Sequence, residues 1–234
     1  MCAAASSSTC RNGQLAAAGL LALALAGCGG VMVQPDGELP AALIEKVDAK
    51  VGVVITPELR DYTHDETRAG VSWQAQLGPG HVKYAEQLFS ASFREVQMTT
   101  SLDEAKAATG LAAIFEPRIE QYSFATARDT GAGYYAVTIG YRLNVYAPTA
   151  ELVDSLTVSG YGSAPAAGMS GEKPLAVATF AAMRDAAAKF LVQFPELAVA
   201  QVLREGRALT AESAAKTLAA SATAADVIET VPIN

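Results

Sequence analysis

The chain has 234 residues, of which 51% are hydrophobic, and a formal net charge of −7 at pH 7, so it lacks the basic surface that binds nucleic acid or anionic lipid headgroups. Its length suits one domain with extensions. The three cysteines are Cys2, Cys10 and Cys28, so a chain cut before Cys28 keeps no second thiol for a disulfide, a zinc site or nucleophilic catalysis.

Residues 15–27 predict a secretory signal peptide. They are apolar, follow Arg11 and a Ser-rich start, and are too short for a hydrocarbon core that needs about 20 apolar residues. The run ends in LAGC, which resembles the lipobox of bacterial lipoproteins. The resemblance implies that a signal peptidase removes residues 1–27 and that Cys28 carries a diacylglyceryl group and an amide-linked acyl chain such as palmitate. The four positions of this motif are Leu25, Ala26, Gly27 and Cys28. The alternative is a buried cysteine in an apolar amino-terminal helix.

Acyl chains on Cys28 would anchor the protein on a membrane. Each buried methylene contributes about 0.8 kcal/mol, so two or three chains hold almost permanently. Gly29 follows the cysteine, where lipoproteins retained in the inner membrane carry aspartate, and the resemblance therefore implies the periplasmic leaflet of the outer membrane. Residues 28–50 are expected to form a lipidated tether, with a short helix over Pro40–Val47, that lifts the domain off its membrane.

Residues 51–197 are predicted to form one α+β domain. Its first half contains a β-branched strand over 51–55, stopped by Pro57, and then a polar loop over 61–70. Apolar residues at helical spacing predict an amphipathic helix over 81–96. A capping box, Ser101-Leu-Asp-Glu104, opens a short helix that ends at Gly110.

Alternating apolar residues over 135–147 predict a long, half-buried strand. Strands over 111–126, with Pro117 at a bend or edge, and over 152–162 flank it. Their short connections predict an antiparallel meander. A helix over 174–194 follows, with Val177 and Phe180 in its buried stripe, and residues 198–234 form an Ala-rich helical or loose extension. The order β-α-β-β-β-α predicts a small, mainly antiparallel sheet with helices packed on one face.

This element order and the stretch IGYRLNVYAPTAELVDSLTVSGYG resemble two periplasmic groups. One is the lipopolysaccharide-assembly lipoprotein of the outer membrane. The other is the amino-terminal domain of the Tol-system protein, with its curli-secretion relatives. The resemblance covers roughly residues 51–194 and implies a non-catalytic assembly or accessory role. No signature residue of either group transfers, and the insertion between residues 61 and 80 departs from both.

Three short motifs suggest chemistry, but each has a simpler structural explanation. Asp129-Thr130-Gly131 matches the aspartic-protease triplet, which needs a second carboxylate, and a hairpin loop favours the same residues. Ser170-Gly-Glu-Lys173 matches S-x-x-K but lacks its companion motifs. The acidic run from Asp61 to Glu66 could bind a cation, but a solvated loop explains it as well. The sequence therefore predicts no enzyme, cofactor or metal.

Aromatic and basic residues on the polar side of the 135–147 strand suggest a partner surface. Tyr134, Arg142 and Tyr146 share the phase of Thr138 and Asn144, opposite the apolar residues. Tyrosine and arginine are enriched at interface hot spots. Two functions remain: an envelope lipoprotein that binds another envelope protein, or a periplasmic binding module for a lipid, glycan or other small envelope ligand.

Overall fold

A computed structural model describes residues 30–38, 45–168 and 170–212. The expected signal peptide and lipobox lie outside the described residues, as does most of the helix expected over Pro40–Val47. Val47 itself is the first residue of a strand, because it pairs with Phe93. None of the described helices has the length and apolar composition needed to cross a bilayer.

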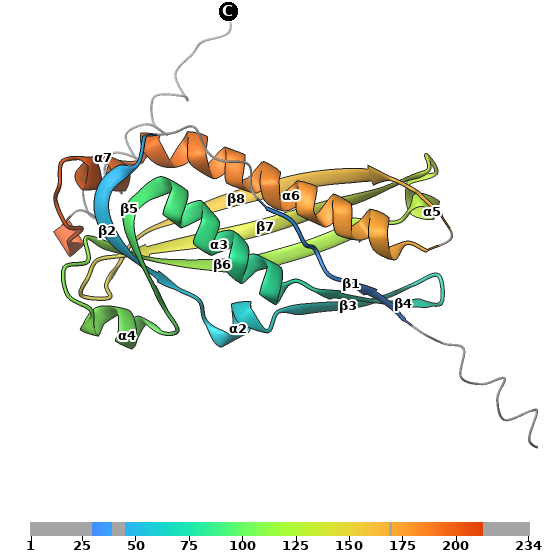
Figure 1. Cartoon of the computed structure of the whole chain (residues 1–234), viewed down its shortest axis with the longest axis horizontal. Helices are drawn as coiled ribbons and strands as arrows, with labels where there is room; N and C mark the ends of the chain where they lie inside the picture. The colour runs from blue at the N-terminus through green and yellow to red at the C-terminus, as the bar shows by residue number, and fades with distance from the viewer. Residues whose placement is uncertain (1–29, 39–44, 169, 213–234) are drawn as a thin grey trace, which may run out of the picture.

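The larger of the two described sheets has five strands in the order β5-β2-β6-β7-β8 (Figure 1). These strands are β5 (Phe93–Thr99), β2 (Val47–Val54), β6 (Ala113–Ala125), β7 (Tyr134–Tyr146) and β8 (Leu152–Pro165). The expected meander is confirmed, since β6, β7 and β8 are antiparallel neighbours. However, β2 runs parallel to both β5 and β6, so the sheet is mixed. The α+β class is confirmed.

The register expected along β7 is also confirmed. Val137, Ile139, Leu143 and Val145 are buried, whereas Thr138 and Arg142 between them are exposed. Pro117 lies in β6 just after β2 stops pairing at Phe115, where the strand has a free edge that tolerates proline.

The helix expected over 81–96 is shorter than predicted. Helix α3 (Gly78–Ser92) ends when Phe93 adopts an extended conformation, and β5 follows directly. Phe89, Phe93 and Val96 fit helical spacing, but Phe93 is buried equally well from a strand beside β2. Pairing with β2 satisfies the backbone groups of this segment, so tertiary structure overrides the local pattern.

The loop expected over 61–70 is also corrected, because it is part of a hairpin. Strands β3 (Thr63–Arg68) and β4 (Val71–Gln76) are joined by Ala69 and Gly70, both with positive φ, as a tight two-residue hairpin turn requires. Strand β1 (Val31–Val33) runs parallel to β4 and completes a second sheet in the order β1-β4-β3. The observed element order therefore adds β1, β3, β4 and β5 to the expected one.

Helices α3 and α6 (Glu172–Gln193) cover one face of the larger sheet (Figure 1). Between them and the sheet lies an aromatic core whose members are Phe89, Phe93, Phe115, Phe190 and Phe194. The expectation of helices on one face does not hold for α4 (Leu102–Ala107). Ala105 packs with Val54 and Ile114 in a separate cluster, and their side chains point away from Val53 and Phe115 in the main core.

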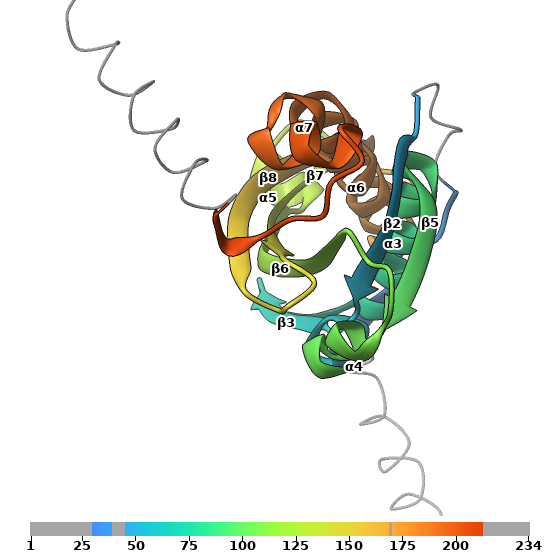
Figure 2. The ribbon, with the colours of Figure 1, turned by 90° about the vertical axis from the view of Figure 1, so that its left-hand side faces the viewer.

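The remaining helices are short. They are α2 (Pro57–Arg60), α5 (Ala127–Thr130), the 3₁₀ turn Phe194–Glu196 and α7 (Ala198–Arg204). Pro195 lies in the 3₁₀ turn that follows α6, as expected from its restricted backbone. Figure 2 looks onto the end of the molecule at which both α7 and α4 lie. Val199, Leu203 and Leu209 are buried in the main core, so packing continues beyond residue 197.

Helix α6 approaches β8 through small residues. The expected stripe is wrong at Val177, which is 52% exposed, while Ala178 and Ala182 face the sheet. A Cβ atom at Gly162 would lie 2.1 Å from the carbonyl oxygen of Ala178, and one at Gly160 would lie 2.0 Å from that of Ala182. The helix backbone therefore lies directly on the strand.

This contact predicts that Gly162→Ala lowers the free energy of unfolding by about 1–3 kcal/mol or more, because the new methyl group meets helix backbone that cannot rotate away. Gly140→Ala is the matched control, since its Cβ atom would meet only Gln121, at 3.4 Å from its Cβ and 3.8 Å from its backbone nitrogen. Urea denaturation of the purified variants measures both. Equal stability of the two variants would contradict the close packing of α6 on β8.

Candidate binding surface

The face of the larger sheet opposite α3 and α6 carries polar side chains from β6, β7 and β8. On β7, Tyr134, Thr138 and Arg142 are exposed. Thr157 and Tyr161 of β8 are their cross-strand neighbours, since Thr157 pairs with Arg142 and Tyr161 with Thr138. We call this exposed group of Thr138, Arg142, Thr157 and Tyr161 the Arg142 surface. Its mixture of hydroxyl, phenol and guanidinium groups can hydrogen-bond a partner without a cavity.

A buried carboxylate organises one side of this face. Glu116 on β6 is 2% exposed. It accepts hydrogen bonds from Arg118 Nε and Nη2 at 3.0 and 2.8 Å, from Asn144 Nδ2 at 3.1 Å and from the Tyr146 hydroxyl at 2.6 Å. These four donors satisfy both carboxylate oxygens, which offsets the cost of burying the charge.

The same contacts shift the acidity of the group. Burial by itself raises the pKa of Glu116, but the hydrogen bonds from Arg118, Tyr146 and Asn144 outweigh it, and the pKa falls below its ordinary value. Burial and the neighbouring carboxylate raise the pKa of Tyr146 to about 12. Glu116 is therefore an anion and Tyr146 a neutral donor at neutral pH.

Arg142 also has a partner within the sheet. It forms an ion pair with Glu120, and the side chains of the two residues are 44% and 39% exposed. Acidic and basic side chains alternate along this part of β6, in the order Glu116, Arg118 and Glu120, and Arg118 lies opposite Arg142 in the strand register. An exposed pair of this kind contributes little to stability, which leaves the guanidinium group able to exchange Glu120 for a partner carboxylate.

The structure places Tyr134, Arg142 and Tyr146 on one face, as expected, but not in one site. Tyr134 and Tyr146 are the two ends of β7, about 40 Å apart at roughly 3.3 Å per residue. Tyr146 bonds to Glu116 and packs partly against the α4 cluster, whereas Tyr134 lies beside α5. Sequence reasoning missed Glu116, although a lone acidic residue within the apolar run AIFEP was a usable signal.

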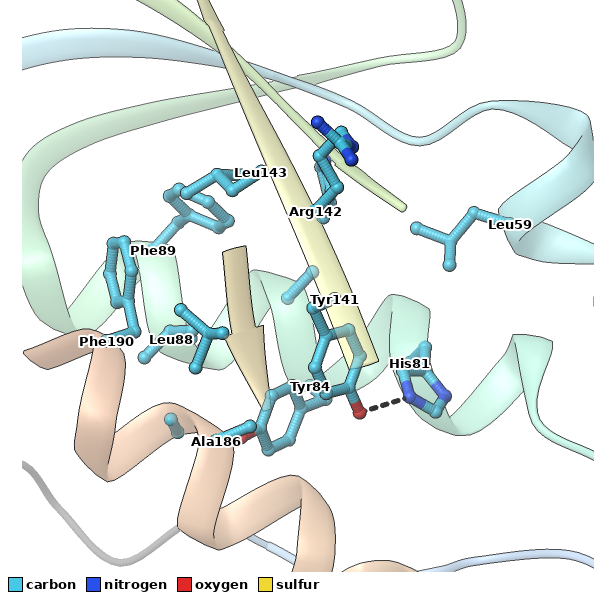
Figure 3. Close-up of a pocket in the computed structure, with 14 residues that line it drawn as sticks. Leu59, His81, Tyr84, Leu88, Phe89, Tyr141, Arg142, Leu143, Ala186 and Phe190 are labelled. Carbon is cyan, nitrogen blue, oxygen red and sulfur yellow. Dashed lines mark hydrogen bonds between the residues drawn. The ribbon is translucent and has the colours of Figure 1, made fainter. Parts of the chain in front are cut away.

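On the inner face, a hydrogen bond between His81 and Tyr141 lies beside an apolar cavity of about 70 Å³ (Figure 3). The cavity lining includes Tyr84, Leu88, Phe89, Leu143, Ala186 and Phe190. Figure 3 shows Tyr141 and Arg142 pointing to opposite sides of β7, with Tyr141 directed toward His81. Sites for drug-sized ligands start at about 300 Å³, so this cavity is too small for such a molecule.

His81 uses both ring nitrogens in this contact. Its Nδ1 lies 2.7 Å from the carbonyl oxygen of Leu77, which can only accept, so Nδ1 carries the proton. The Tyr141 hydroxyl then donates to Nε2 at 2.7 Å. His81 is 3% exposed, and burial lowers its pKa to about 4. In this arrangement the imidazole is neutral and has no free nitrogen for proton transfer.

The motifs that suggested chemistry have structural roles. Asp129 accepts hydrogen bonds from the backbone and hydroxyl of Thr126 and so caps α5. Ser170 accepts a hydrogen bond from the backbone N–H of Glu172 at the start of α6.

The acidic run is divided between the two sides of β3. His64 lies 3.3 Å from Glu66, while Asp65 accepts from Gln74 of β4 at 2.9 Å. Within the described ranges, no group of three or more potential ligands converges on a metal position.

No protein-family model matches the sequence, and no curated protein matches it. Solved structures with partial similarity include a homolog of the neuraminyllactose-binding hemagglutinin from Helicobacter pylori, with TM-score 0.41 and 9% identity over 74% of this chain and 97% of that one. Lipoprotein GNA1162 from Neisseria meningitidis has TM-score 0.31 and 11% identity over 63% and 99% of the two chains. A Caulobacter crescentus protein assigned as a lipoprotein has TM-score 0.30 and 13% identity over 44% and 76%. These values are too low to transfer a function.

The burial of His81 predicts a specific dependence of stability on pH. Between pH 6.5 and about 4, the unfolded chain binds a proton that the folded protein does not, so the free energy of unfolding decreases as the pH falls through this window. The contribution is on the order of 3 kcal/mol. Urea denaturation of His81→Gln at several pH values between 4 and 7 should show a free energy of unfolding that lacks this part of the decrease.

The matched control is His64→Gln, which changes the only other histidine and keeps His81. Because His81 is unchanged, this variant should keep the part of the pH dependence that comes from His81. If His81→Gln retains the full wild-type slope, His81 is not the buried neutral group described above.

Proposed function

We propose that this protein is a lipid-anchored lipoprotein of the bacterial envelope that binds another envelope protein as a non-catalytic accessory or assembly factor. The observation that carries the proposal is the motif Leu25-Ala26-Gly27-Cys28 at the end of an apolar run, with Cys28 as the acylated residue. Gly29 after the cysteine favours the periplasmic leaflet of the outer membrane as its location.

Binding rather than catalysis is supported by the state of the ionisable groups. His81 uses both ring nitrogens inside the core, and Asp129 caps a helix. Glu116 is bonded by three neighbouring side chains. General acid–base chemistry needs a group that can reach a substrate proton, and these groups are committed to the fold.

The Arg142 surface is the part of the sheet best suited to a protein partner. Tyr161 is 53% exposed, and the Arg142 side chain is 44% exposed. Both residue types combine a large contact area with directional donors. Tyr146, which the sequence placed in the same surface, would contribute indirectly. It belongs to the Glu116 cluster, in which Arg118, Asn144 and Tyr146 donate hydrogen bonds to Glu116 and hold this side of the face rigid.

A protein partner is favoured over the alternative of a lipid, glycan or other small ligand. The cavity beside His81 measures about 70 Å³, and two further cavities, beside Lys83 and beside Arg204, measure about 270 and 210 Å³. All three are below the roughly 300 Å³ at which sites for drug-sized ligands start. An open sheet face with alternating charges suits an extended protein surface better, since contact area there does not depend on a pocket.

The anchor predicts that Cys28→Ala abolishes lipidation, because only a thiol can form the thioether. Cells fed an alkyne fatty acid should label the wild-type protein and not the variant, and the variant should keep residues before position 28. Equal labelling of both proteins would contradict the proposal. So would an intact mass of mature wild-type protein that includes those residues.

The binding face predicts that Arg142→Glu and Tyr161→Ala each weaken capture of the partner more than tenfold, the effect of losing a hot spot of about 2 kcal/mol. Capture is measured by cross-linking in cells followed by purification from solubilised envelopes. Glu120→Gln is the matched control, because it breaks the same ion pair but keeps Arg142. If all three variants fold and capture the partner at the wild-type level, the Arg142 surface is not the binding face.

A further inference from the structure

The first described strand is built into the fold immediately after the proposed lipidation site. Val31 pairs with Trp73 and Val33 with Ala75, and Val33 is fully buried. Gly30 already lies against β4, since a Cβ atom there would be 3.2 Å from the carbonyl oxygen of Ser72. Gly30, the first described residue, is therefore already part of the folded body, about twenty residues before the expected end of the tether at residue 50.

The connection between Cys28 and this body is short. Two Cα–Cα steps of 3.8 Å separate Cys28 from Gly30, so the two Cα atoms cannot be more than about 8 Å apart. A glyceryl group attached to Cys28 lies at the membrane surface. Gly30 must then lie within roughly that distance of the lipid headgroups, whatever conformation the connection adopts.

The parallel pairing of β1 with β4 determines which end of the body is held there. Because the strands run in the same direction, the start of β1 lies beside the start of β4, next to the β3–β4 turn. Arg68 at this turn forms an ion pair with Asp129 of α5 at 3.3 Å. Figure 1 shows the β3–β4 turn and α5 at one end of the long axis and α4 and α7 at the other.

Exposed apolar side chains occur at this same end. Val71 at the turn is 41% exposed, Met32 in β1 is 48% exposed, and Tyr134, which follows α5, is 36% exposed. Apolar and tyrosine side chains are suited to the interface between headgroups and acyl chains. They give this end a surface that tolerates contact with lipid without a basic patch.

We infer that the end of the body formed by the β3–β4 turn, the start of β1 and α5 rests on the lipid surface, with the long axis of the sheet directed away from the membrane. The inference rests on the proposed lipidation of Cys28. The far end of β7, with Tyr146 and the Glu116 cluster, is then about 40 Å from the lipid. The Arg142 surface faces sideways, where a partner can reach it.

The test measures the distance of each end from lipid headgroups. In the mature lipidated protein, Cys28 is a thioether and Cys2 and Cys10 are removed, so an introduced cysteine is the only free thiol. Val71→Cys and Leu152→Cys place one environment-sensitive fluorophore at opposite ends, at positions that are 41% and 56% exposed. Each protein is reconstituted in phosphatidylcholine vesicles that contain a headgroup-nitroxide lipid, and quenching is recorded.

We expect quenching at position 71 to exceed that at position 152 at least threefold. Inserting twenty Gly and Ser residues between Gly29 and Gly30 should remove most of this difference, because such a linker spans about 25 Å on average. Equal quenching at both positions, or stronger quenching at position 152, would overturn the inference. A difference that survives the insertion would overturn the role of the short connection.

Flotation of the vesicles on a density gradient separates this result from a failure of the proposed anchor. Protein that does not float with the vesicles contradicts lipidation, and the orientation inference fails with it. Protein that floats but shows no difference between the two positions retains the anchor and contradicts only the orientation.

Discussion

The close contact between α6 and β8 is the constraint on which the rest of the body depends. Gly160 and Gly162 present no side chain, so the backbone of α6 at Ala178 and Ala182 lies directly on the strand. This position brings Phe190 and Phe194 over the sheet, where they meet Phe89 and Phe93. A larger residue at either glycine would lift the helix and open the aromatic core, which needs close packing.

With one face of the meander occupied by α3 and α6, the other face is left for polar interactions. The alternation of β7 sends Ile139 and Leu143 into the core and Thr138 and Arg142 to the opposite side. A charged residue can be buried on the polar side only with donors close by. Glu116 has them in Arg118, Asn144 and Tyr146, and this cluster gives the proposed binding face a rigid border.

The amino-terminal strand connects the fold to the proposed location of the protein. A tether of some twenty residues would let the domain rotate freely above a membrane, whereas β1 starts three residues after Cys28 and is paired along its length with β4. If Cys28 is lipidated as proposed, the parallel direction of β1 therefore decides which end of the molecule meets lipid. The sideways direction of the Arg142 surface follows from the same constraint.

The amino-acid sequence by itself determined the meander, the two faces of β7, the capped helix at Ser101 and the long Ala-rich helix, because each is encoded in local periodicity or capping. It also supplied the motif Leu25-Ala26-Gly27-Cys28, on which the proposed lipidation rests and which can be read without the fold. Only the tertiary structure decided that Phe93 belongs to a strand, that residues 63–76 form a hairpin, and that Ala178 rather than Val177 faces the sheet. In each of these places the local pattern fits two conformations, and the choice depends on partners distant in sequence: β2 for Phe93, β1 for the hairpin and the glycines of β8 for α6. Glu116 belongs to the same class, since its burial is tolerated only because β7 brings Asn144 and Tyr146 within hydrogen-bond distance.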